Sequence, residues 1–230
     1  MEKTYFRHEY KYIINACDHE ILRSRLSRVM AQDIHTDGRG RYTIVNIYFD
    51  SPGDAALCQK IDGVDIREKF RMRYYNKDTD HIHLEKKTKQ NNLCHKEGVW
   101  ISGGECLKIL DGDIKWLKEE ISRPLLQELY GKMVVQQLRP KTVSVYERMP
   151  FVCPAGNVRV TLDSGMRTGI HSRDFLQADK VPTAYSGGEK TYLLEVKYDS
   201  FLPEHIRAMI QLGGRNLSAY SKYAQSRSFG

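Results

Sequence analysis

The chain has 230 residues, enough for one large β-rich domain that buries a core without help from metals or disulfides. Lys and Arg number 36 against 29 Asp and Glu, a net charge of +7, which favours an anionic partner such as a nucleotide, polyphosphate, nucleic acid or a membrane surface. The 5 cysteines are scattered without C-x-x-C spacing, which indicates reduced thiols and excludes a disulfide or zinc framework.

The sequence contains no apolar run of the signal-peptide type. No segment approaches the roughly 20 apolar residues that span a bilayer. Together with the reduced cysteines, this predicts a cytoplasmic protein. If the protein acts at a membrane surface, a membrane-protein partner has to supply the spans.

Residues 5–14 form the first of several segments whose alternation predicts a strand with charge on one face. Arg7, Glu9 and Lys11 share one parity, and mostly aromatic and aliphatic residues occupy the other. A helix is expected next, capped by Asp18. Its apolar positions recur at helical spacing and are Ile21, Leu22, Leu26, Val29 and Met30.

Residues 42–50 are apolar on both parities and end at a Ser-Pro-Gly turn. The stretch REKFRMRYYN follows at residues 67–76. Its alternation places four cations on one face, namely Arg67, Lys69, Arg71 and Arg73. Phe70 and Met72 lie on the opposite face, and Arg67 is expected at the end of the basic row.

Residues 80–89 are the next predicted strand, whose charged parity is His81, His83, Glu85, Lys87 and Lys89. Lys86 has the opposite parity and is expected on the outer face. His81 and His83 have the spacing of transition-metal ligands, and His95 follows, but no third ligand is identifiable. A phosphate-contacting or surface role is therefore favoured for these histidines.

The second half of the chain repeats the pattern. A helix is predicted over about 114–130, and strands over 141–149, 157–163 and 191–199. Their polar parities carry Tyr146 with Arg148, Arg159 with Thr161 and Asp163, and Glu195 with Lys197. A helix led by Pro203 follows. Glycine pairs at 103–104, 187–188 and 213–214 predict turns, and none has the spacing of a nucleotide-binding loop.

A charged strand face is usually a solvated face, but here it recurs in one strand after another. The pattern favours a single α+β domain over residues 1–230, in which about eight antiparallel strands form a β-barrel with a polar interior and helices packed outside. Buried unpaired cations cost several kcal/mol each, so such an interior needs water, carboxylates or a bound polyanion.

The spacing of the cations suits a chain of phosphates. Residues two apart on a strand lie roughly 6.5 to 7 Å apart. Each phosphate carries charge and accepts several hydrogen bonds, and the planar fork of Arg can bind two of its oxygens.

Seven short motifs occur in an order that resembles the VTC domain. They are R-x-E-x-K from Arg7, K-x-R-x-R from Lys69, L-E-x-K from Leu84, Y-x-R from Tyr146, R-V-T-L-D from Arg159, L-E-V-K-Y-D from Leu194 and S-K-Y from Ser221. The VTC domain is the polyphosphate polymerase module of the vacuolar transporter chaperone family, among the CYTH-like triphosphate tunnel metalloenzymes. The resemblance spans nearly the whole chain.

This resemblance implies an eight-stranded antiparallel tunnel that binds ATP with Mn²⁺ or Mg²⁺ and transfers the terminal phosphoryl group to inorganic polyphosphate. It implies phosphate binding or catalysis by Lys11, Arg71, Arg73, Lys87, Lys96, Arg148 and Arg159, with contacts from Tyr146, Ser221 and Lys222. Lys69 and Lys197 belong to the same rows and are expected to bind substrate. Glu195 matches the metal-binding glutamate, and Glu9 and Glu85 either help to hold the metal or pair with neighbouring cations.

One residue departs from the hydrolytic members of the superfamily, which typically begin with E-x-E-x-K. Here Arg7 takes the first acidic position. Loss of that carboxylate weakens metal and water activation, and the guanidinium is expected to add a phosphate contact. The departure favours a polymerase over a triphosphatase or adenylate cyclase.

Three alternatives remain open from the sequence. The tunnel could belong to a triphosphate hydrolase, or to a sensor that binds polyphosphate or nucleotide without turnover. A nucleic-acid-binding module is disfavoured, because most aromatic residues lie opposite the basic rows, whereas a stacking platform needs both on one face.

Overall fold

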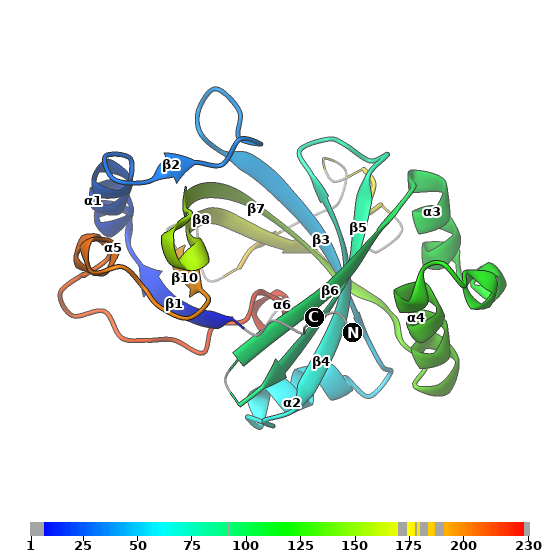
Figure 1. Ribbon diagram of the computed structural model, residues 1–230. Helices are drawn as coiled ribbons and strands as arrows, with labels where there is room; N and C mark the ends of the chain where they lie inside the picture. Colours follow the sequence, from blue (N-terminus) through cyan, green and yellow to red (C-terminus); the bar gives the residue numbers. More distant parts are fainter. Residues whose placement is uncertain are drawn as a thin grey trace.

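The computed structural model describes residues 7–91, 93–169, 174–177, 179, 184–186 and 191–227. A curled antiparallel sheet lies at the centre, with helices on its outer face (Figure 1). In spatial order its eight main strands are β1 (His8–Ile14), β10 (Tyr192–Tyr198), β8 (Val158–Gly169), β7 (Arg139–Cys153), β3 (Tyr42–Asp50), β4 (Arg67–Tyr75), β5 (Ile82–Gln90) and β6 (Leu93–Ile101). Two short strands, β2 (Ala31–Gln32) and β9 (Ala184–Tyr185), pair with β7 and β8.

The two edges of the sheet, β1 and β6, meet at one point. Arg7 and Cys94 form an isolated antiparallel bridge there, with backbone N–H to O=C distances of 3.0 and 3.2 Å. Accumulated strand twist brings edges so distant in the sheet order together. The predicted α+β fold with an eight-stranded antiparallel barrel is confirmed.

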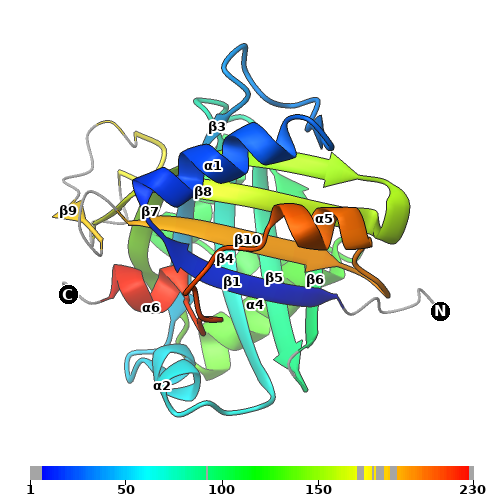
Figure 2. The same ribbon diagram turned by 90° about the vertical axis from the view of Figure 1, so that its left-hand side faces the viewer.

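Helices cover the outside of the barrel in two groups. The helices α1 (Ala16–Leu26) and α5 (Glu204–Met209) lie over β8 and β10 (Figure 2). On the opposite side, α3 (Gly103–Asp111), the 3-10 helix η1 (Lys115–Glu119) and α4 (Pro124–Val135) pack against β4 and β5 (Figure 1). The remaining short helices are α2 (Ala55–Ile61), η2 (Ala155–Asn157) and α6 (Lys222–Ser226).

Strand β4 shows why the barrel has a polar interior. Phe70, Met72 and Tyr74 are buried in the hydrophobic core that also contains Ile109 of α3 and Leu129 of α4. Burial of each large apolar side chain contributes about 1.5 to 3 kcal/mol to the stability of the fold. Packing against the outer helices therefore favours the orientation in which this face of β4 points away from the barrel interior. The basic parity of the strand is left to face the interior of the barrel.

Three local predictions are wrong at helix ends. The N-cap of α1 is Asn15, and Asp18 is the third residue of its capping box, where each side chain accepts a hydrogen bond from the other residue's backbone. The helix predicted over 114–130 is two elements, because Pro124 begins α4 and disfavours helical backbone at Arg123. The glycines 103–104 open α3 behind the N-cap Ser102 instead of forming a turn.

The glycine pair at 213–214 forms the predicted turn, whereas 187–188 lies outside the described residues. Strand β6, α2, α3 and α6 were not predicted. Among the described residues, the longest apolar helical stretches are too short to cross a bilayer.

Candidate functional site

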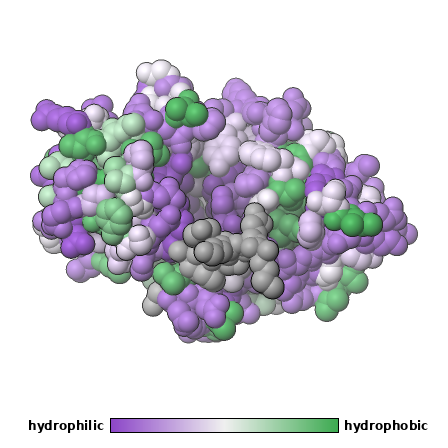
Figure 3. Space-filling view, viewed as in Figure 1, coloured by the Kyte–Doolittle hydropathy of each residue, from purple (hydrophilic) through white to green (hydrophobic). Residues whose placement is uncertain are grey.

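A polar cavity lies inside the barrel. It is lined by Glu9, Lys11, Tyr48, Lys69, Arg71, Arg73, Lys87, Tyr146, Arg148, Glu195, Lys197 and Lys222. These residues come from β1, β3, β4, β5, β7 and β10 and from the first residue of α6. Segments far apart in the sequence therefore converge on one interior space, and the molecule is hollowed between its two halves (Figure 3).

Positive charge predominates in the described lining of this cavity. Eight of the lining residues are Lys or Arg and two are Glu. Glu85 and Asp163 are buried beside the lining and raise the carboxylates to four, against eight cations. Because a surplus of buried cations is costly without a counter-charge, this interior suits a ligand with several negative charges.

A tight ion network holds one wall of the cavity. Arg148 donates Nε and Nη2 to the two carboxylate oxygens of Asp163, both at 2.7 Å. Lys222 Nζ lies 2.6 Å from Asp163 Oδ2 and 2.6 Å from Glu195 Oε1. Burial alone would raise the pKa of Glu195, but Lys222, Lys197 and Lys11 hold this pKa well below its usual value.

Glu9 and Glu85 are also paired with cations. Glu9 lies 2.6 Å from Lys87 Nζ and 3.5 Å from Lys197 Nζ. Glu85 binds Arg71 at 2.5 Å and Lys96 at 2.8 Å. Burial would raise the pKa of both glutamates, but the neighbouring cations keep these pKa values well below normal, so both carboxylates are ionised.

Among the described residues that line the inner cavity, Arg73 and Lys69 form no ion pair with a carboxylate. Arg73 is 5% exposed, and its guanidinium donates to Asn46 Oδ1 at 2.8 Å and to the hydroxyl of Tyr146 at 3.4 Å. Lys69 Nζ lies 5.7 Å from the ring centroid of Tyr48, and within the described part of the chain it forms no ion pair. Their charges remain available to an anion.

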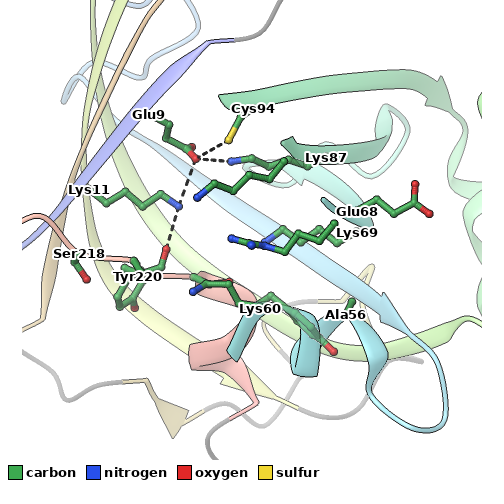
Figure 4. A pocket seen from close by; sticks show the side chains of 15 residues that line it. Glu9, Lys11, Ala56, Lys60, Glu68, Lys69, Lys87, Cys94, Ser218 and Tyr220 are labelled. Carbon is green, nitrogen blue, oxygen red and sulfur yellow. Dashed lines mark hydrogen bonds and ion pairs between the residues drawn. The ribbon is translucent and has the colours of Figure 1, made fainter. Parts of the chain in front are cut away.

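The cavity continues into an outer pocket (Figure 4). Glu9, Lys11, Lys69 and Lys87 line both spaces. The outer pocket adds cations at its rim, which are Lys60 of α2, Arg67 of β4 and Lys89 of β5. Lys11 Nζ donates to the backbone oxygen of Tyr220 at 3.1 Å, which ties the C-terminal segment to this pocket.

Most of the residues predicted for the site line the inner cavity. Glu85 and Lys96 lie beside it, joined to Arg71 through the Glu85 carboxylate. Ser221 lines the outer pocket, where its hydroxyl accepts from Ala224 N at 3.3 Å and caps α6. Arg159 lines neither space: its Nη2 lies 2.6 Å from Asp33 Oδ2 and donates to the Tyr42 hydroxyl at 2.8 Å.

Arg7, which was expected to add a phosphate contact, forms an ion pair with Asp199. Its Nε lies 2.7 Å from Asp199 Oδ1, beside the bridge that joins β1 to β6. The carboxylate is a competing partner that sequence parity did not reveal. The absence of an acidic residue at position 7 still distinguishes the chain from the hydrolytic pattern.

The predicted histidine positions do not form a metal site. His81 pairs with Asp78 and is exposed, whereas His83 Nδ1 lies 3.0 Å from Glu85 Oε1. No group of three or more His, Cys, Asp or Glu side chains with metal-site geometry occurs among the described residues. Lys86 lies on the outer face, paired with Glu128 of α4 at 2.8 Å, as predicted.

Glu9 and Glu195 fit a divalent cation as a pair. Lys11 and Lys197 each lie within 3.9 Å of both carboxylates, so the two glutamates face the same small region. Mg²⁺ is commonly held by one or two carboxylates together with substrate phosphates and water. The donor set is therefore suitable for such an ion once a phosphate ligand completes it.

Residue pairing across β7 and β8 reveals one residue that sequence reasoning did not assign to the site. Asp163 stands directly opposite Arg148 in the register. Its inward parity was visible in the sequence, but its partner was not. Asn46 and Tyr48 of the apolar strand β3 were missed as well, because neither carries a charge.

The pKa of Lys197 predicts how ligand binding depends on pH. Burial lowers this pKa to about 8, although Glu195 and Glu9 oppose the shift. The protonated ammonium attracts an anion, so deprotonation as the pH rises through about 8 removes a binding charge. We expect the affinity for tripolyphosphate to fall several-fold from pH 7 to pH 9.

Isothermal titration calorimetry at both pH values checks this expectation, with Lys197→Met as the comparison. The variant should bind more weakly at pH 7 and lose less affinity on going to pH 9. Burial and the cations Lys87 and Lys11 also lower the pKa of Lys69, so some pH dependence should persist. An equal fall in both proteins would contradict the assignment to Lys197.

Comparison with known families decides the relationship that the motifs suggested. The family model described as the VTC domain matches residues 6–229. The chain belongs to the VTC domain family. The matched residues include every strand of the barrel and the helices from α1 to α6.

The VTC domain is also similar to solved structures at low sequence identity. The PH1819 protein from Pyrococcus horikoshii OT3 is 12% identical, with a TM-score of 0.49, and the match covers 95% of this chain and 96% of that one. The Mimivirus capping enzyme triphosphatase is 10% identical, with a TM-score of 0.44 and 91% coverage of both chains. None of the curated proteins compared matches the sequence.

Proposed function

We propose that this VTC domain is a polyphosphate polymerase that transfers the terminal phosphoryl group of ATP to a growing polyphosphate chain inside the barrel. Membership of the family supports a role with triphosphate or polyphosphate substrates. The observation that carries the proposal is the cavity with eight lining cations against two lining carboxylates. Both substrates are linear polyanions, and their mutual repulsion is the main obstacle to bringing them together.

The proposed reaction needs positioning and charge neutralisation more than proton transfer. An oxygen of the chain-end phosphate forms a bond to the γ-phosphorus of ATP. The bond from that phosphorus to the β,γ-bridging oxygen breaks, and ADP leaves with the electron pair. Because the attacking oxygen is already anionic, no general base is required.

The side chains of the cavity have distinct parts in this proposal. Arg73 and Lys69 form no direct ion pair within the described part of the chain, and so they neutralise the triphosphate oxygens. Arg71 is orientated by Glu85, and Arg148 by Asp163, so each presents its guanidinium in a fixed position. Glu9 and Glu195 would hold Mn²⁺ or Mg²⁺, which supplies further neutralisation of phosphate oxygens when bound.

Incubation of the purified protein with ATP and Mn²⁺, with and without a short polyphosphate primer, tests the proposal. Formation of ADP in step with long polyphosphate chains is the expected result, and chelation of the metal with EDTA should stop it. Release of free phosphate from tripolyphosphate without chain growth would instead show a hydrolase. Tight binding of both ligands without any product would show a sensor.

The sensor is a second candidate, because one observation favours it. Every carboxylate of the site is paired with cations, including those proposed to hold the metal. A metal therefore has to displace lysine ammonium groups before it can bind Glu9 or Glu195.

Cytoplasmic location and a membrane-protein partner stay predictions.

A further inference from the structure

A stacked aromatic pair lies on the inner face of the barrel wall. His83 of β5 and Trp100 of β6 are direct partners in the antiparallel register. Their ring centroids are 4.5 Å apart with an interplanar angle of 30°, so the rings are stacked. Side chains of directly opposed residues lie on the same face, and His83 shares its parity with Glu85 and Lys87. The pair therefore belongs to the same face as the phosphate-binding cations.

Gly98 makes room for this arrangement. It stands opposite Glu85 in the register, one position along the same face from Trp100. A Cβ atom at this position would overlap the imidazole of His83, so no other residue lets the ring lie there without a shift. His83 Nδ1 is also 3.0 Å from Glu85 Oε1. The Glu85 carboxylate thus holds the imidazole on one side, and Gly98 leaves room for the ring on the other.

Trp100 is unusually open for so large an aromatic residue. It is 55% exposed, while the next residue, Ile101, is 3% exposed. The second tryptophan, Trp116, is used differently, since its indole N–H donates to Asp113 O at 3.0 Å at the start of η1. Among the described residues, His83 is the ring partner of Trp100, and much of the indole remains free for a further contact.

The pair lies at one end of the cation rows. Arg73, His83 and Trp100 are successive register partners across β4, β5 and β6. Neighbouring strands are about 4.8 Å apart, so Trp100 stands about 10 Å from Arg73 across the sheet. The opposite end of β5 carries Lys87 and Lys89 and leads to the outer pocket. The aromatic pair therefore lies beside the Arg73 end of the basic row on β4, and the other end of β5 is rich in lysine.

We propose that Trp100, held in place by His83 and Gly98, is the platform on which the base of the nucleoside triphosphate stacks. The proposal rests on the proposed function and adds the position and orientation of the donor. The triphosphate of the nucleotide extends from Trp100 toward Arg73 and Arg71, and the polyphosphate chain occupies the end with Lys60, Arg67 and Lys89. Any base has an aromatic face, so this contact favours nucleotides over inorganic triphosphate without selecting one base.

Calorimetric titration of wild type and Trp100→Ala with ATP and with inorganic tripolyphosphate in the same buffer tests this platform. Loss of the stacking contact with one base predicts about a tenfold loss of ATP affinity. The affinity for tripolyphosphate, which has no base, should stay within about twofold of wild type. Trp100→Phe should recover most of the ATP affinity, since it keeps an aromatic face.

Tryptophan fluorescence gives an independent readout. In a Trp116→Phe variant, Trp100 is the remaining tryptophan of the two in the chain. ATP should quench its emission, whereas tripolyphosphate at saturation should not. Unchanged ATP affinity in Trp100→Ala, or an equal loss for both ligands, would overturn the platform while leaving the tunnel assignment intact. Failure of wild type to bind either ligand would overturn both the platform and the proposed function.

Discussion

Replacing Arg73 by Ala is expected to weaken the binding of tripolyphosphate by about 100-fold. The guanidinium is buried and donates to neutral acceptors, Asn46 and the Tyr146 hydroxyl, and it forms no direct ion pair among the described residues. Hydrogen bonds to charged groups contribute about 1.5 to 3 kcal/mol each, and two such bonds to a phosphate amount to the predicted loss. Calorimetric titration measures it directly.

The control for this variant is Arg123→Ala on the outer surface. Arg123 pairs with Glu105 and Glu120 next to α4, on the far side of the sheet from the cavity. The Arg123→Ala variant loses the same charge as Arg73→Ala, and its tripolyphosphate affinity should stay within about twofold of wild type. Circular dichroism of both variants checks that the barrel is intact. Similar losses in both would mean that net charge, and not position in the cavity, governs binding.

The second large effect is expected on stability. Asp163→Asn removes the carboxylate that accepts two hydrogen bonds from Arg148 and forms an ion pair with Lys222. Breaking a buried ion pair by removing one partner costs about 3 to 5 kcal/mol. Arg148 and Lys222 would stay buried and share Glu195 as their remaining carboxylate partner. We expect urea denaturation to show a loss of about 3 kcal/mol or more in the free energy of unfolding.

Glu147→Gln is the matched comparison for Asp163→Asn. Glu147 lies on the same strand as Arg148 and pairs with Arg41 at the surface. Exposed ion pairs contribute about 0 to 1 kcal/mol, so this variant should be almost as stable as wild type. If Asp163→Asn also changed the free energy of unfolding by less than about 1 kcal/mol, the network would not be a structural support of the cavity wall.

The inward direction of the basic rows was predictable from alternation. In β4 the apolar residues Phe70 and Met72 face the outer helices, and Lys69, Arg71 and Arg73 follow from period two. The recurrence of this pattern in other strands was the sequence signal for a polar interior. A single strand could not have indicated a polar interior, since a charged strand face is more often exposed to solvent.

Partners from distant segments could not be predicted. Arg159 has the parity of an inward residue, but Asp33, from the segment between α1 and β3, is its ion-pair partner. Arg7 is similarly paired with Asp199. Such pairings depend on which loops meet in space, and sequence spacing within one strand carries no information about them.

Strand β6 was missed for a local reason. Its residues LCHKEGVWI contain Gly98, which has low strand propensity, and its charges do not fall on one parity. Gly98 is explained only by the cross-strand contact with His83. The aromatic pair therefore became apparent only when the register of β5 and β6 was known.

Two adjacent lysines offer the most direct test of the polar barrel interior. Lys87 faces the cavity and pairs with Glu9, whereas Lys86 faces outward and pairs with Glu128 of α4. Replacing each by Met removes the same charge one residue apart, and tripolyphosphate affinity is then measured by calorimetry. We predict at least a tenfold loss for Lys87→Met and less than a twofold change for Lys86→Met. Equal losses, or a larger loss for Lys86→Met, would contradict the assignment of the basic face to the interior.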